Sequence, residues 1–179
     1  MSKTNQNNDT DKKIWGKFFW NLLFTIAQYS NNIDNSLLSD LIDIIPNVLP
    51  CDECQKHTEQ IYQRLKLYNS PGSNYDENIW QLYSEIQNAI GKNKITLNDY
   101  NNIVKSNQII INIDDMIALL NILSKNKTRT KTNCKSCRGK LRKSDIHSFI
   151  DLLNKICDNI PHLNDFKNVS DLLYMMSYH

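Results

Sequence analysis

Apolar residues recur at helical spacing along almost the whole chain. The first such stripe consists of Ile14, Phe18, Leu22 and Ile26, flanked by Trp15, Phe19 and Leu23. A repeat of three to four residues predicts an amphipathic helix over residues ~12–29. The 179 residues include only four glycines and four prolines, which leaves few positions for tight turns. We therefore expect an all-α protein.

Three more helices are predicted before residue 92. The second carries Leu37, Leu38, Leu41, Ile42, Ile44 and Ile45, has Asn35 or Ser36 as its N-cap, and ends near Pro46. The third runs from Cys51 to about Tyr68, and residues 69–74 form a loop. The fourth spans Ile79 to Ile90 and stops at Gly91. Four helices joined by short loops predict a compact four-helix bundle.

The second half of the chain reads as an extension. Thr96 can cap a short helix through Val104, residues 108–113 are β-branched and could form a strand, and residues 114–123, 145–157 and 170–176 have helical patterns. We divide the chain into a flexible N-terminal tail (1–11), the bundle (12–105) and a helical extension with a basic CxxC segment (106–179).

Two cysteines follow a proline in the segment Leu49-Pro-Cys-Asp-Glu-Cys-Gln-Lys-His57. Thiols at this spacing can close a disulfide across one helical turn. Cys51 would lie at a helix start, where free N–H groups and the helix dipole stabilise a thiolate. From its residues alone, the segment is either a redox centre or half of a zinc site.

The five cysteines are Cys51, Cys54, Cys134, Cys137 and Cys157. The chain shows no secretory signal, and in such a setting paired thiols are more often catalytic or metal-binding than structural. Cys157 lies in an apolar helical pattern, so we expect it to be buried. A net charge of +2 gives no general attraction to nucleic acid or membrane. The run from Ile14 to Ala27 is too short to cross a bilayer.

Three motifs in order carry a resemblance to a known family. Trp15-Gly16-Lys-Phe-Phe-Trp20-Asn-Leu-Leu-Phe24-Thr-Ile-Ala27 is similar to the WGxxxWxxLHxxA opening of the Erv/ALR family of FAD-linked sulfhydryl oxidases. The CxxCxxH from Cys51 to His57 resembles that of the poxvirus-like branch. A tryptophan-bearing helix then ends in Ile90-Gly91-Lys92, as the family's HNxVNxxLGK helix does. The resemblance covers roughly residues 12–105.

The resemblance implies FAD held within the bundle beside the CxxC. Cys51 would exchange with substrate, and Cys54 would face the flavin. His57 could contact the flavin or assist proton movement. The implied cofactor-binding residues are Trp15, Gly16, Trp20, Phe24, His57, Trp80, Tyr83 and Lys92. Without the resemblance, a tryptophan at helical spacing is more often core, His57 a surface residue, Tyr83 a packed residue and Lys92 a solvated one.

The chain departs from the family pattern at its polar positions. Phe24 replaces the histidine of the opening motif. In the fourth helix, anchoring on Gly91 puts Tyr83, Ser84 and Gln87 at the family's His, Asn and Asn. Anchoring on Trp80 instead puts Glu85, Ile86 and Ala89 there.

The second pair, Cys134 and Cys137, lies in a basic stretch from Lys125 to Lys143. It could be a shuttle disulfide between substrate and the first pair, half of a zinc site completed by a partner or by His147 and Cys157, or an exposed reduced pair. Zinc held across both pairs is disfavoured, because eighty residues separate them. The basic stretch lacks interleaved aromatic residues, so a solvated linker is favoured over a nucleic-acid site.

The sequence thus predicts an FAD-dependent thiol oxidase that forms protein disulfides and passes electrons to oxygen, giving hydrogen peroxide. The implied partners are a thiol-containing protein or a thioredoxin-like carrier, and the implied assembly is a homodimer. The viral-type motif implies oxidation of virion or assembly proteins in host cytoplasm or the virion, without secretion. Two alternatives stay open: a degenerate bundle without FAD that acts as a scaffold, and a zinc module using both CxxC pairs.

Overall fold

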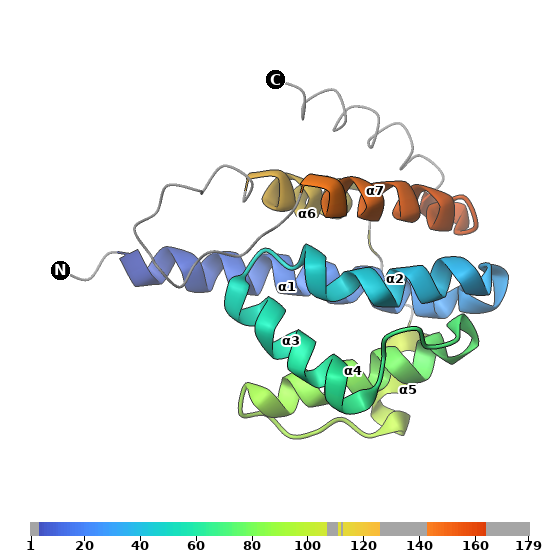
Figure 1. Ribbon diagram of the computed structural model, residues 1–179, viewed down its shortest axis with the longest axis horizontal. Helices are drawn as coiled ribbons and strands as arrows, with labels where there is room; N and C mark the ends of the chain where they lie inside the picture. Colours follow the sequence, from blue (N-terminus) through green and yellow to red (C-terminus); the bar gives the residue numbers. More distant parts are fainter. Residues whose placement is uncertain (1–3, 107–110, 112, 126–142, 164–179) are drawn as a thin grey trace.

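The computed structural model describes residues 4–106, 111, 113–125 and 143–163, and its regular elements are all helices (Figure 1). They are α1 (Thr4–Gln28), α2 (Asn35–Val48), α3 (Asp52–Leu65), α4 (Tyr75–Ala89), α5 (Leu97–Lys105), α6 (Ile113–Lys125) and α7 (Lys143–Cys157), with short 3-10 turns at Ser30–Asn32, Gly72–Asn74 and Pro161–Leu163. The predicted all-α class is confirmed, and the described ranges contain no strand. The strand considered over 108–113 falls largely outside them, and Ile113 itself begins α6. The candidate helix 170–176 also lies outside.

Helices α1 and α2 lie between two groups of helices (Figure 1). On one side α6 packs on α1 and α7 packs on α2. On the other side α4 and α5 pack on α1, while α3 and α4 pack on α2. A single apolar core includes residues of all these elements, and the rings of Phe19 and Phe149 stack across it at 6.3 Å. The division at residue 105 stays a prediction, but α6 and α7 share the core of the preceding helices.

Helix α1 begins earlier than the sequence suggested. Residues 4–11, expected to be a flexible polar tail, form its first two turns. No glycine or proline separates them from the apolar stripe, and each added residue gains a backbone hydrogen bond once the helix exists. Polar composition therefore failed to mark the start of the helix. No helix within the described ranges is both long enough and apolar enough to span a membrane.

The helix ends are set by local capping groups. Asp34, and not Asn35 or Ser36, caps α2: its carboxylate accepts from the Ser36 N–H at 2.7 Å. Thr96 caps α5 as predicted, accepting from the Asp99 N–H at 3.1 Å. Helix α3 ends three residues before Tyr68, because Lys66 adopts a left-handed φ of 56° that closes the last turn.

The end of α2 differs from expectation in a way that bears on the cysteines. The helix was predicted to end near Pro46, and it ends two residues later at Val48, with Pro46 inside its last turn. Because proline has no N–H, it cannot donate to the carbonyl of Ile42 one turn earlier. The buried Tyr62 hydroxyl of α3 takes that place and donates to Ile42 O at 2.9 Å. A tertiary hydrogen bond thus replaces the missing helical one.

Candidate functional site

Cys51 and Cys54 lie at the N-terminus of α3. Cys51 is the N-cap residue with extended backbone, and its Sγ accepts from the Cys54 N–H at 3.4 Å. Both cysteines are half-buried, and Cys54 packs against the apolar core. A sulfur that accepts from a helix N-terminus lies where negative charge is favoured, so this position stabilises the thiolate of Cys51.

The segment before Cys51 is held on both sides. The Gln55 amide donates to the carbonyl of Leu49 at 2.8 Å, and Leu49 is itself buried. Tyr62 secures the last turn of α2, as described above. Helix α3 therefore holds the segment before Cys51 by two hydrogen bonds. One reaches Leu49 directly, and the other reaches Ile42 in the last part of α2. Neither Gln55 nor Tyr62 was predicted as a site residue, because both act through backbone carbonyls that a sequence does not reveal.

Three of the predicted cofactor-binding residues form an aromatic cluster between α1 and α4. The ring of Tyr83 lies 4.7 Å from Trp20 and 5.0 Å from Phe24, both in edge-to-face arrangement. Trp20 and Phe24 stack at 5.8 Å. Phe24 is buried, whereas Trp20 and Tyr83 are half-buried. The cluster thus joins these three positions and leaves flat aromatic surface on two of them.

Tyr100 of α5 completes this aromatic cluster and was missed by the sequence reading. Its ring lies 5.7 Å from Phe24. The residue is buried, and its hydroxyl has no hydrogen-bond partner in the described part of the chain. The capping residue Thr96 predicted its helix, but only packing could show which face of α5 turns inward. A buried hydroxyl without a partner costs stability unless a ligand or water satisfies it.

The other predicted cofactor residues on α1 and α4 lie apart from this cluster. The ring of Trp15 lies 6.4 Å from that of Phe19, which in turn lies 6.5 Å from that of Trp20. An added Cβ on Gly16 would meet no atom within 4 Å, so α1 is not crowded there. The Trp80 indole donates to Ile95 O at 2.9 Å and lines a pocket of about 320 Å³ with Leu65. Leu65 ends α3, about 20 Å along the helix from Cys51.

The remaining predicted site residues are exposed, buried or outside the described ranges. His57 and Lys92 are both exposed. Cys157 is 2 % exposed, as predicted, and burial raises the pKa of its thiol to about 12. Cys134 and Cys137 lie outside the described residues. Within the described part, no group of three or more His, Cys, Asp or Glu side chains could hold a metal ion.

The polar positions of α4 are occupied by protein partners. Ser84 Oγ accepts from the Ile95 N–H at 3.1 Å and donates to Ile95 O at 3.2 Å. Glu85 pairs with Arg64 at 2.7 Å and with Lys94, and these contacts, the Lys94 hydrogen bond foremost, lower the pKa of its carboxyl. Ser84 and Glu85 are therefore already satisfied by protein groups and do not present free hydrogen-bonding atoms to a flavin.

Comparison with known proteins gives one partial similarity. No family model matches the chain, and no solved structure matches it. A relative named "Putative FAD-linked sulfhydryl oxidase 096R", from Invertebrate iridescent virus 3, is 37% identical over 51 residues. The matched region is 26% of this chain and 34% of the relative, so the chain spans about a third of the relative's length. This similarity supports the resemblance to FAD-linked sulfhydryl oxidases over part of the chain.

Proposed function

We propose that the chain is a thiol oxidase that uses Cys51 and Cys54 as its redox pair and FAD as its electron acceptor. The single observation that carries the proposal is the Cys51 sulfur at the N-terminus of α3, where it accepts the Cys54 N–H. The partial similarity to a protein named as an FAD-linked sulfhydryl oxidase supports the same chemistry.

The proposed reaction uses the two thiols one after the other. A substrate thiolate attacks the Cys51 sulfur of the Cys51–Cys54 disulfide and forms a mixed disulfide, and Cys54 leaves as a thiolate. The second substrate thiolate then attacks the substrate sulfur of the mixed disulfide, which releases the substrate disulfide and Cys51 as a thiolate. The α3 N-terminus stabilises the Cys51 thiolate and so makes it a better leaving group. The substrate loses two electrons, and the enzyme pair gains them.

FAD, when bound, would accept the two electrons and pass them to oxygen, giving hydrogen peroxide. In this proposal the half-buried Trp20 and Tyr83 would hold the isoalloxazine ring, and the buried Phe24 would support them. More distant parts of the cofactor would contact three further residues, namely Trp80, His57 and Lys92. Cys134 and Cys137 stay a proposed shuttle.

The setting and partners are also proposals. The relative is a protein of an invertebrate iridescent virus, which supports a viral setting; action on virion or assembly proteins follows from the resemblance alone. The resemblance alone implies three further features. They are a homodimer, a protein substrate or thioredoxin-like carrier, and a location in host cytoplasm or the virion.

Oxygen consumption with a small dithiol tests the proposal. The purified full-length protein, supplied with FAD, should consume oxygen, and Cys51→Ser and Cys54→Ser should each abolish turnover. Cys157→Ser is the matched control, because Cys157 is buried at the end of α7, outside the CxxC motif, and the change should leave turnover unchanged. Turnover that survives in both Cys51→Ser and Cys54→Ser would sink the proposal. A protein that never binds FAD would favour the scaffold alternative, and stoichiometric bound zinc would favour the zinc module.

A further inference from the structure

Cys51 lies between two helix ends of opposite partial charge. Helix α2 ends at Val48 and α3 begins at Asp52, so a short connection carries Cys51 from one helix to the next. The C-terminal carbonyls of α2 carry partial negative charge, whereas the N-terminal N–H groups of α3 carry partial positive charge. A thiolate on Cys51 is therefore stabilised by α3 and destabilised by α2.

The side chains close in sequence do not offset the charge at the end of α2. The last turn of α2 has no basic residue. The first turn of α3 follows Cys51 with the acidic residues Asp52 and Glu53, whose charges also oppose a thiolate. Hydrogen-bond donors that reach the carbonyls at the end of α2 therefore matter for the charge that Cys51 can carry.

Gln55 of α3 is such a donor. Its side-chain amide donates to Leu49 O at 2.8 Å and reaches Asn47 O at a longer 3.5 Å. Its backbone N–H donates to Cys51 O at 2.8 Å. Leu49 is buried and Gln55 is half-buried, so water has little access to replace the side-chain bond. One residue thus holds the chain on both sides of Pro50 and places its N–H groups over the end of α2.

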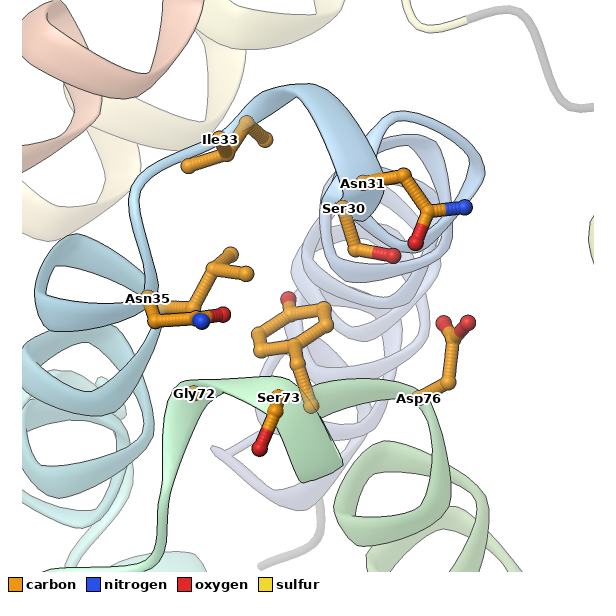
Figure 2. A pocket seen from close by; sticks show the side chains of 9 residues that line it. Ser30, Asn31, Ile33, Asn35, Gly72, Ser73 and Asp76 are labelled. Atoms are coloured by element: carbon orange, nitrogen blue, oxygen red, sulfur yellow. The ribbon is translucent and has the colours of Figure 1, made fainter.

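The start of α2 is fixed independently of Gln55. Figure 2 shows the corner where α1 turns into α2, with Asn35 and Gly72 close to each other. A Cβ on Gly72 would lie 1.9 Å from the backbone oxygen of Asn35, so the two segments are in contact there. Asn35 begins α2, about 20 Å along the helix from Val48. Any freedom of the segment before Cys51 therefore arises at the C-terminal end of α2, where Gln55 binds.

We propose that Gln55 is a positioning residue for Cys51, an inference that rests on the proposed thiol chemistry. Its amide holds the Leu49 carbonyl, which keeps the Cys51 sulfur at the N-terminus of α3, and its N–H dipoles oppose the negative end of α2. In the second proposed step, the bond between the Cys51 sulfur and the substrate sulfur breaks, and its electron pair goes to Cys51 Sγ. Gln55 stabilises this leaving thiolate without gaining or losing a proton.

Gln55→Met tests the proposal, because methionine has a similar length and no N–H. In the reduced full-length protein, iodoacetamide should alkylate Cys51 with a half-maximal rate at a pH about 0.5–1 unit higher than in the wild type, as expected when a helix-end interaction with the thiolate is weakened. Peptide mass spectrometry assigns the rate to Cys51. In equilibrium with glutathione, the Cys51–Cys54 disulfide should be about threefold harder to reduce.

Two further variants separate the contact from the composition of the helix. Gln60→Met is the matched control, because Gln60 is an exposed glutamine of the same helix, and it should leave both measurements unchanged. Gln55→Asn keeps an amide that is one methylene too short to reach Leu49 O, so it should behave as Gln55→Met does. If Gln55→Met does not fold, Gln55→Asn decides.

The neighbouring titratable groups and the fold are controlled in the same experiment. Residues 44–50 contain no titratable side chain, and the exposed titratable residues of the first two turns of α3 are unchanged in every variant, namely Glu53, Lys56 and His57. Their titration therefore moves all pH profiles equally. The buried Cys157 should resist iodoacetamide in each variant that is folded.

The outcomes distinguish this inference from the proposed function, because both measurements are made without flavin. An unchanged pH profile and glutathione equilibrium in folded Gln55→Met, equal changes in Gln60→Met, or wild-type behaviour of Gln55→Asn would each overturn the positioning role. Oxygen consumption by the wild type would then still support the thiol oxidase. Conversely, shifted profiles in a protein that consumes no oxygen would support the positioning role and contradict the oxidase.

Discussion

Replacing Tyr62 with phenylalanine should destabilise the protein through one hydrogen bond. The Tyr62 hydroxyl supplies the donor that Pro46 cannot give to the carbonyl of Ile42. Tyr62 is 0 % exposed, so water cannot replace the lost donor in the variant. The phenyl ring keeps the same volume and its contact with Tyr68 at 5.1 Å, which confines the change to the hydroxyl.

The magnitude follows from leaving a buried carbonyl without a partner. Such a group costs about 1–3 kcal/mol. For a chain of this size, about 1 kcal/mol lowers Tm by about 2–4 °C. We therefore expect Tyr62→Phe to lower Tm by roughly 4–8 °C for a central cost of about 2 kcal/mol. Urea unfolding followed by circular dichroism measures the free-energy change directly.

A double-mutant cycle with Pro46→Ala isolates the cause. Alanine at position 46 restores an N–H that can donate to Ile42 O, so the Tyr62→Phe change should cost less in that background. The expected coupling is about 1 kcal/mol or more. Tyr68→Phe serves as the control, because its hydroxyl bonds to Glu59 at a part-exposed position. An equal cost of Tyr62→Phe in both backgrounds would refute the reasoning.

Further substitutions test close packing, the buried hydroxyl and the buried thiol. Gly72→Ala should cost about 3 kcal/mol or more in urea unfolding, because its Cβ would overlap the Asn35 carbonyl, whereas Gly16→Ala should stabilise by about 0.5–1 kcal/mol. Tyr100→Phe removes a hydroxyl without a partner and should raise the apoprotein Tm by about 2–4 °C; a lower Tm would show that the hydroxyl is satisfied. The Cys157 thiol, whose pKa folding raises from 9.0 to about 12, should resist iodoacetamide in the native protein. Its contribution to stability should fall as the pH rises above 9.0, and modification of the native thiol would contradict its burial.

The sequence predicted the helical elements well because their apolar stripes repeat over several turns. Gly91 stops α4 with a φ of 81°, and Thr96 caps α5, since each acts through its own backbone or side chain. One difference, at the end of α2, involves a distant residue. Tyr62 supplies the hydrogen bond that Pro46 cannot give inside α2, and nothing local to Pro46 indicates that contact.

The candidate site was predictable at its cysteines but only partly around them. The spacing of Cys51 and Cys54 after a proline was enough to place them at a helix start. The resemblance of the opening motif singled out Trp20 and Phe24, yet it could not show that Tyr83 meets them while Trp80 turns toward Ile95. Which face of α4 meets α1 depends on packing between helices, which the sequence pattern of one helix does not contain.

The visible absorbance of the purified protein after incubation with FAD and gel filtration tests the central claim most directly. The account predicts a bound flavin spectrum that a dithiol bleaches without oxygen and that air restores. Bleaching should be lost in Cys54→Ser and retained in Cys157→Ser. A colourless protein, or a flavin that bleaches equally in Cys54→Ser, would contradict the claim that Cys51 and Cys54 pass electrons to FAD.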